Sequence, residues 1–270
     1  MVNKNGKSAE KDADGHQQSP IDIVTSAVIH DPSLKSSKLK INYEIGDADT
    51  VEVTKKGFNV WMKNGAKSSI AGTHLPYGNE YRLAQFHAHW GENKKCGSEH
   101  FLNGKPYSGE IHCVFWNTSY GTSENAFKHA DGMTVLAIFI HEHAHNNMAF
   151  EPLIDSIKFA QRNSDKKAKV NPNFDLNLLM PDKHFFYTYH GSLTTPPHDE
   201  CVIWTILRRH VHIGHSQMEV LRSIVKSNVR NIQPLEGRKI RSSFVLKHRD
   251  ESEHRQNGRS ENGKSGSEHE

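Results

Sequence analysis

The sequence has few cysteines and no cysteine motif. Only three occur among 270 residues, Cys96, Cys113 and Cys201, and no two of them have the Cys-x-x-Cys spacing of a zinc finger or a redox site. An odd number of scattered cysteines also argues against a disulfide framework. We therefore expect free thiols in a reducing compartment.

Long hydrophobic runs are absent as well. No stretch of 18 or more apolar residues is present to form a membrane-spanning helix. Met1 and Val2 lead directly into polar residues, rather than into the apolar region of a signal peptide. Together with the free thiols, these absences predict a cytoplasmic protein that does not associate with a membrane.

Neither sign of charge dominates. The chain has 34 lysines and arginines against 31 aspartates and glutamates, a net charge of +3 with histidine neutral. A nucleic-acid partner would require clustered basic residues, so none is expected. The 20 histidines are an unusual number, and most must lie on the surface because a functional site uses only a few.

Apolar side chains are scarce at both ends of the chain. Residues 3–18 contain none larger than alanine, and no aliphatic or aromatic residue follows Leu246. This composition predicts that residues 1–17 are a disordered segment and that residues 247–270 are a disordered charged tail. Residues 18–246 contain no repeat and no linker, which predicts one domain.

The middle of the chain consists of short segments with strand character, separated by turn-forming residues. The strands are expected at residues 57–62, 81–90, 109–116, 133–140, 185–189 and 200–207. Helical spacing of apolar residues predicts only two helices, 148–162 and 217–226, the second with Ser216 and Glu219 in capping-box register. The pattern indicates a mainly β (α+β) fold.

Two histidines lie two residues apart in the strand expected at residues 81–90. His87 and His89 would project from the same face, about 7 Å apart along the chain. That face would consist of Leu83, Gln85, His87 and His89. The opposite face, which we expect to pack in the core, would consist of Ala84, Phe86, Ala88 and Trp90.

A third histidine makes this pair a candidate metal site. His112 shares a strand face with Glu110 and follows His89 at a distance that allows a loop and a return strand. Three neutral imidazoles leave the fourth position of a tetrahedral zinc ion open, which is the catalytic pattern. Gln85 and Glu110 each precede a histidine by two residues, where they could orient its ring. A lone histidine on a strand is more often an ordinary core or surface residue.

A rival metal site lies in one continuous stretch. His141, His143 and His145 alternate with Glu142 and Ala144, and the stretch runs into polar residues. It follows an apolar strand and is expected at a surface strand end. We expect weak adventitious metal binding there rather than a catalytic centre, because no distant ligand or orienting partner is apparent.

Several separated motifs give the strongest functional signal. They are QSPIDI (18–23), FHAHWG (86–91), GSEH (97–100), HCVFWNTSYG (112–121), DGMTVLAIFI (131–140) and GSLTTPPHDECVIW (191–204). In type, order and spacing they resemble the α-carbonic anhydrases, over nearly the whole chain between the tails. The resemblance implies a single domain with a large, mostly antiparallel twisted β-sheet of about ten strands, a few short peripheral helices and zinc at the bottom of a conical cavity.

The resemblance also implies roles for individual residues. The zinc ligands would be His87, His89 and His112, and Gln85 and Glu110 would be the hydrogen-bond partners of His87 and His112. Thr194 matches the residue that accepts a hydrogen bond from zinc-bound hydroxide. Glu99 matches the carboxylate that accepts a hydrogen bond from that threonine.

A substrate site is implied beside the metal. It would comprise Val114, Val135, Leu193, Thr195, Val202 and Trp204, most of them on an apolar wall where CO2 would sit. Ordinary core packing explains the apolar residues equally well.

The implied activity is that of a zinc lyase, a carbonic anhydrase that reversibly hydrates CO2 to bicarbonate and a proton through zinc-bound hydroxide. Zinc lowers the pKa of bound water to about 7, a value established for carbonic anhydrase itself. The fold also occurs without catalysis, which leaves a silent binding protein and a metal- or mineral-associated protein as alternatives. The three histidines, Glu99 and Thr194 favour the enzyme. We expect it to be a monomer that acts on a small molecule.

One position departs from the fast members of the family. Lys56 stands where they carry a histidine that relays protons at the cavity mouth. A lysine ordinarily has a pKa near 10.4 and is poorly matched to this task at neutral pH, whereas histidine, near 6.5, is well matched. We therefore expect slower turnover that depends on buffer. His74 and His198 are alternative relays.

Overall fold

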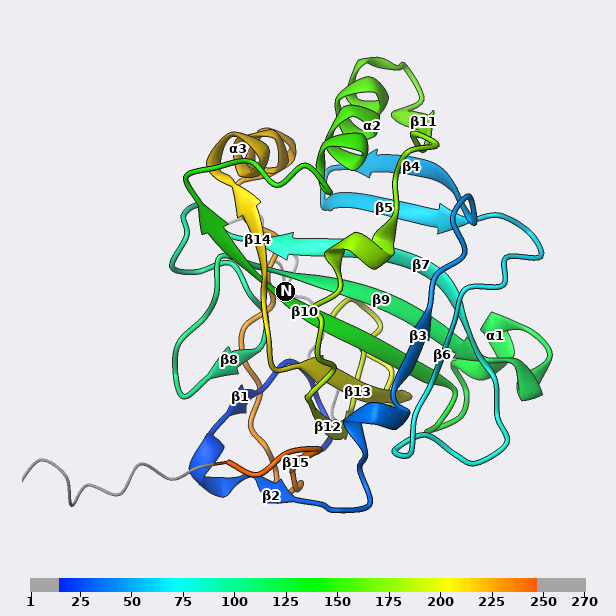
Figure 1. Cartoon of the computed structure of the whole chain (residues 1–270), viewed down its shortest axis with the longest axis vertical. Helices are drawn as coiled ribbons and strands as arrows, with labels where there is room; N and C mark the ends of the chain where they lie inside the picture. The colour runs from blue at the N-terminus through cyan, green and yellow to red at the C-terminus, as the bar shows by residue number, and fades with distance from the viewer. Residues whose placement is uncertain (1–14, 247–270) are drawn as a thin grey trace, which may run out of the picture.

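The fold is built on one large twisted β-sheet, seen in a computed structural model that describes residues 15–246 (Figure 1). Its main row is, in order, β11 (Lys167–Lys169), β4 (Ala48–Thr54), β5 (Gly57–Met62), β7 (Tyr81–Trp90), β9 (Gly109–Asn117), β10 (Met133–His143), β13 (Val202–Leu207), β12 (Phe186–Gly191), β15 (Arg241–Ser242) and β2 (Ile29–His30). This mainly β architecture confirms the fold class predicted from the sequence.

Three more strands pair off the main row. They are β3 (Lys40–Asn42), β6 (Ser69–Ala71) and β14 (Val211–Gly214). With them the sheet has 13 strands within the described part of the chain, more than the expected number of about ten. Most pairings are antiparallel as predicted; the parallel ones are β10–β13, β10–β14, β15–β2 and the separate two-stranded sheet of β1 (Asp22–Ile23) and β8 (Phe101–Leu102).

The central strands lie close to their predicted positions. β5 and β7 have the predicted bounds, and β9 is one residue longer. β10 is fully buried from Met133 to Ile140 and continues to His143, because β14 pairs with its last four residues. β12 and β13 begin later than predicted, at Phe186 and Val202. The ladder between these two antiparallel strands starts at Phe186 of β12, and its other end is at Val202 of β13.

One residue of β7, Leu83, lies on the face of the strand opposite to the one predicted. Leu83 does not share the face of His87 and His89 but packs in the core cluster that contains Phe86. The reason is an irregularity in the ladder to β9, where the register shifts between Leu83 and Gln85. A bulge inserts one extra residue into a strand, so the side chains that precede it point to the opposite face from the one that regular alternation predicts. From Gln85 onward the predicted alternation holds.

Three α-helices occur among the described residues: α1 (Ser123–Ala126), α2 (Glu151–Arg162) and α3 (His215–Ile224). Short 3-10 turns occupy Thr25–Ala27, Ser36–Lys38, Thr118–Tyr120 and Leu176–Leu179. α2 begins three residues later than predicted, because Asn147 holds the preceding turn by accepting a hydrogen bond from the Ala149 N–H at 3.0 Å. The prediction missed α1, a single turn.

The predicted cap of α3 was wrong. The helix begins at His215 and its N-cap is Gly214, whose N–H donates to Gln217 Oε1 at 2.9 Å, so Ser216 and Glu219 do not form the capping box. It also ends two residues early. The carbonyl of Val225 accepts a hydrogen bond from Trp90 Nε1 at 2.8 Å, and Val225 has an extended backbone that stops the helix.

The sheet has two different faces. On one face, Ile111 of β9 belongs to a large apolar cluster that also contains Ile154 of α2 and Leu221 of α3. On the other face, a second cluster contains Val114 of β9 and Trp204 of β13. His112 alternates with Ile111 and therefore lies on the second face, away from the two long helices.

The sequence also led to expectations about the chain ends, the cysteines and membrane helices. The segments 1–14 and 247–270, predicted to be disordered, lie outside the described residues. Gln17 is described, and its N–H donates to Glu200 Oε1 at 2.7 Å. All three cysteines are free, as predicted, with Cys113 and Cys201 buried. Between residues 15 and 246, none of the helices has the length and apolar character needed to cross a membrane.

Candidate metal centre

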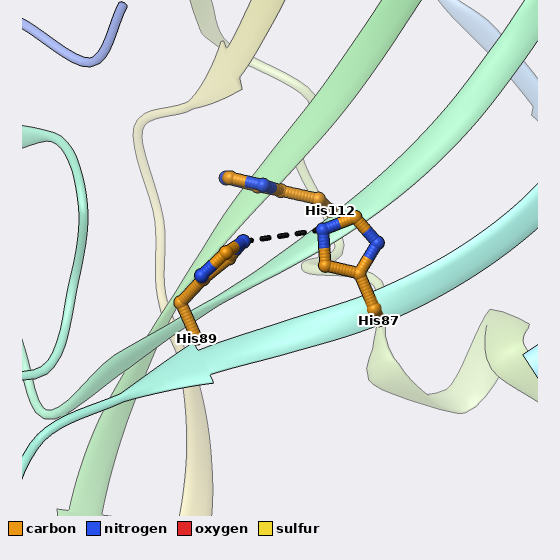
Figure 2. Close-up of side chains that lie close together, drawn as sticks. All are labelled: His87, His89 and His112. Carbon is orange, nitrogen blue, oxygen red and sulfur yellow. Dashed lines mark hydrogen bonds between the residues drawn. The ribbon is translucent and has the colours of Figure 1, made fainter. Parts of the chain in front are cut away.

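Three histidines converge at the middle of the sheet (Figure 2). His87 and His89 extend from β7, and His112 lies directly opposite His87 on β9. The Nε2 atoms of His87 and His89 are 3.1 Å apart, and one ring nitrogen from each of the three lies within 4.8 Å of the others. His89 and His112 are buried, and His87 is partly exposed.

The other ring nitrogen of each histidine faces a hydrogen-bond acceptor. His87 Nδ1 lies 2.9 Å from Gln85 Oε1, and His112 Nε2 lies 2.9 Å from Glu110 Oε1. These are the partners that sequence reasoning expected. His89 Nδ1 lies 2.9 Å from the main-chain oxygen of Asn228, a partner that sequence reasoning missed.

This arrangement favours a cation between the rings. Because both Nδ1 atoms donate to acceptors, the Nε2 atoms of His87 and His89 present lone pairs to each other at 3.1 Å. Burial, followed by the neighbouring imidazoles His89 and His112, also holds the pKa of His87 well below its usual value, so its ring is neutral. Three imidazoles whose inward ring nitrogens converge fit a zinc ion.

Glu110 links the site to a buried polar chain. Its Oε1 lies 2.7 Å from His100 Nδ1, and its Oε2 accepts from the His100 N–H at 2.8 Å. His100 Nε2 lies 2.7 Å from the hydroxyl of Tyr189, which is 2.7 Å from Ser19 Oγ. Burial alone would raise the pKa of Glu110, but His100 and His112 lower it, so Glu110 is ionised and orients the ring of His112. This series of hydrogen-bonded side chains was not predicted from the sequence.

Glu99 is wholly buried beside the histidines. Its Oε1 accepts from the Arg230 N–H at 2.9 Å and lies 3.3 Å from His89 Nδ1. Its Oε2 has no hydrogen-bond partner, so the bond expected from Thr194 is absent in this conformation. Thr194 is buried in the loop after β12, and the unpartnered Oε2 of Glu99 is left with free acceptor capacity.

Comparison with known proteins decides the family. A family model described as eukaryotic-type carbonic anhydrase matches residues 3–244. The chain belongs to the eukaryotic-type carbonic anhydrase family. Carbonic anhydrase 3 of Bos taurus is 35% identical over 244 residues, which cover 86% of this chain and 91% of the relative. Carbonic anhydrase 1 of Mus musculus is 36% identical with the same coverage.

The apolar residues expected at the substrate site of this carbonic anhydrase form a row across three strands. Val135 of β10 pairs with Val114 of β9 on one side and with Trp204 of β13 on the other. The Trp204 ring centroid lies 5.0 Å from that of His112. The row therefore borders the histidines directly.

The other residues expected there lie at the end of the same apolar cluster. Val202 is buried, Leu193 packs against the cluster and Thr195 is exposed. Trp204 Nε1 donates to the carbonyl of Ser192 at 3.1 Å, which ties the loop that carries Leu193 to the sheet.

Lys56 lies in the tight turn between β4 and β5 and is exposed. Its carbonyl accepts a hydrogen bond from Asn228 Nδ2 at 3.0 Å, and the carbonyl of the same asparagine is the partner of His89. Gly57 follows with φ +135°, and a Cβ there would lie 2.9 Å from Asn228 Nδ2. Glycine at this position therefore allows the turn to approach the site closely.

The two alternative relays are both buried. His74 Nε2 lies 2.7 Å from Thr205 Oγ1, and the His74 ring packs 4.6 Å from that of Phe186. Burial, with smaller effects of Arg241 and His190, lowers the pKa of His74 to about 3, which is far from the value a relay needs. His198 is only 4% exposed.

The buried state of His74 predicts a pH-dependent stability. Its folded pKa of about 3 lies below the usual value of 6.5, so the unfolded chain takes up the proton first as the pH falls. The contribution of neutral His74 is present above about pH 6.5 and is lost between about pH 6.5 and 3. We expect His74→Gln to flatten the pH dependence of the unfolding free energy there, by up to about 1.4 kcal/mol per pH unit.

Urea unfolding at a series of pH values measures this slope. His145→Gln is the matched control, because His145 is exposed and its replacement should leave the slope unchanged. Equal slopes for His74→Gln and the unmodified protein would contradict the account.

Proposed function

We propose that the chain is a zinc enzyme that reversibly hydrates CO2 to bicarbonate and a proton. One observation carries the proposal: the inward nitrogens of His87, His89 and His112 converge, while the outward nitrogens all face acceptors. This is a three-ligand site with a position left for water. The family, which includes carbonic anhydrases 3 and 1 among the similar proteins, supports the same reaction.

When bound, zinc would supply Lewis acidity, lowering the pKa of a coordinated water to about 7, a value taken over from carbonic anhydrase itself. The protein's own contribution is orientation. Glu99 Oε2, buried and unpartnered, would accept the hydroxyl proton of Thr194 as a hydrogen bond. The oxygen of Thr194 is then left as an acceptor that can direct the attacking oxygen toward CO2.

The apolar row would hold the substrate. CO2 has no net charge and needs little hydrogen bonding, so Val114, Val135 and Trp204 offer a suitable surface beside His112. Val202, Leu193 and Thr195 would extend this surface toward solvent. Bicarbonate is charged and is poorly held by an apolar surface, which favours its exchange for water.

Stopped-flow measurement of CO2 hydration by the purified zinc-loaded chain tests the proposal. Between pH 6 and 9 we expect hydration well above the buffer rate, increasing with pH as the nucleophile is deprotonated. Background rates in a sample with zinc fully bound would contradict the proposal and indicate a binding protein on a carbonic anhydrase scaffold.

We further propose that Lys56 limits proton release, so that turnover is slow in weak buffer. Replacing Lys56 with histidine should increase kcat in weak buffer by roughly 10-fold or more, because a group with a pKa near neutral is a better relay. The value of kcat/KM should not change, since it reports the attack on CO2 rather than later proton release. Stopped-flow assays over a series of buffer concentrations measure both quantities.

Lys55→His is the matched control for this prediction. Lys55 is also exposed in the turn, but it is one residue farther from the glycine that faces Asn228. An unmodified protein whose kcat is already independent of buffer concentration would show that Lys56 is not limiting.

We also propose that residues 18–246 form the catalytic domain and that it acts as a monomer in the cytoplasm, without a nucleic-acid or membrane partner. The three free thiols suit a reducing compartment. Size-exclusion chromatography with light scattering measures the oligomeric state.

A further inference from the structure

The strands β10 and β14 end side by side (Figure 1). Four histidines, His141, His143, His210 and His212, lie in or next to these strand ends. The strands run parallel, and His141 lies opposite His212. His210 directly precedes β14, and His143 is the last residue of β10. His141, His143 and His212 are exposed and His210 is half-buried, which confirms that the sequence from His141 onward lies at a surface strand end.

Three of these rings are arranged as a triangle. The ring centroids of His141 and His210 are 5.3 Å apart, those of His141 and His212 are 5.7 Å apart, and those of His210 and His212 are 5.0 Å apart. In the buried centre the corresponding distances are 4.7, 5.0 and 5.4 Å. The surface rings therefore have nearly the same spacing as rings that converge on one point.

The two triangles differ in how the rings are turned. Among the described residues, the nitrogens of the surface triangle do not meet within 4.8 Å as those of the buried centre do. Exposed side chains rotate at little cost, and ring rotation changes the nitrogen positions while the strands keep the centroids close. A bound metal would select the convergent rotamers.

The chemistry of the neighbourhood fits a nitrogen-ligated metal. Glu142 points its carboxylate at Arg222 and His215, so it is already paired and is not free to serve as a ligand. Three imidazoles without a carboxylate suit Cu²⁺, Ni²⁺ or Zn²⁺, and Cu²⁺ is expected to bind most tightly.

We propose that His141, His210 and His212 form a second metal site for a divalent transition-metal ion, open to solvent and separate from the buried centre. Ala137 is the residue of β10 that pairs with His112, and His141 lies four residues farther along. This spacing separates the sites by about 13 Å along the strand. His143, whose ring centroid is 5.7 Å from that of His212, is placed as a further donor.

The affinity should be moderate. The open cavity beside His141 is also lined by Lys94, Lys95 and Lys105, whose positive charges oppose a cation. The rings must also lose rotational freedom on binding. Metal binding to imidazole nitrogens releases protons, so binding should weaken in acid.

Titration of Cu²⁺ into the full-length, zinc-loaded protein tests the site. Calorimetry should detect one Cu²⁺ per chain, electron paramagnetic resonance should show coupling to imidazole nitrogens, and metal analysis should show that the zinc is retained. The variant with His141→Asn, His210→Asn and His212→Asn should lose at least about 10-fold in Cu²⁺ affinity, because even the outer partners of metal ligands contribute that much. The single change His212→Asn tests the same point with less perturbation.

The control removes the same number of histidines elsewhere. His248→Asn, His254→Asn and His269→Asn act on the histidine-containing C-terminal segment and should leave Cu²⁺ binding unchanged. Loss of binding in this control, or unchanged binding in both the triple variant and His212→Asn, would overturn the proposal. Zinc content and CO2 hydration, measured on the same samples, report separately on the buried centre.

Discussion

Replacing His112 with alanine should abolish stable zinc binding and reduce CO2 hydration to the uncatalysed rate. His112 is the only one of the three histidines on β9, and it is oriented by the ionised carboxylate of Glu110. The orienting partners of metal ligands alone contribute about 10–100-fold to metal affinity, so loss of a ligand should cost more than about 100-fold. Zinc analysis after dialysis and stopped-flow hydration measure the two effects.

His30→Ala is the control for this variant. His30 is exposed on the edge strand β2, so its replacement should leave both zinc content and hydration unchanged. Thermal unfolding of both variants distinguishes loss of the metal from loss of the fold. A folded His112→Ala protein that still binds one zinc per chain and hydrates CO2 would contradict the assigned ligand set.

Replacing Thr194 with valine should leave zinc bound but lower kcat/KM for CO2 hydration by about 100-fold or more. Valine keeps the shape of threonine but has no hydroxyl, so Glu99 Oε2 loses the donor that we propose for it and the attacking oxygen loses its acceptor. Removing one positioned hydrogen-bonding group from an active site commonly costs 10²–10³ in rate, here about 100-fold as a lower estimate. Zinc analysis and stopped flow on the same sample separate binding from catalysis.

Thr195→Val is the matched control. Thr195 is the neighbouring threonine of the same loop and lies at the exposed edge of the proposed substrate surface, where it has no proposed hydrogen bond to Glu99, so the same chemical change there should have a much smaller effect. Equal losses in the two variants would indicate a general disturbance of the loop rather than a role for the Thr194 hydroxyl.

The shared face of His87 and His89 could be predicted because strand alternation is a local property. His87, His89 and their partner Gln85 lie in one unbroken stretch of β7, where the period of two places them on one face. Leu83 belongs to the same strand but was misplaced, because the bulge before Gln85 has no signature in its apolar sequence. The prediction held as far as the regular ladder extends.

Other partners could not be found from the sequence because they are distant or lie in the main chain. Asn228 is 139 residues from His89 and contributes a carbonyl oxygen, which every residue type has. His100 follows Glu99 in a recognised motif, yet its link to Glu110 depends on the path of the chain between β8 and β9. Only the folded arrangement shows which side chains share a carboxylate.

The surface histidines illustrate the same limit. His141 and His143 were visible as an alternating run, but His210 and His212 are far along the chain and became neighbours only through the parallel pairing of β10 with β14. The sequence alone therefore did not show that distant histidines lie beside this run and could bind a metal ion together with it.

Removal and return of zinc in a single sample tests the central claim most directly. Chelation should reduce CO2 hydration to the uncatalysed rate, and stepwise addition of zinc should restore it in proportion until one zinc per chain is bound at the buried centre. Further zinc, including any that binds the surface histidines, should add no activity. Hydration that persists without zinc, or that fails to return when the buried centre is filled, would contradict the account.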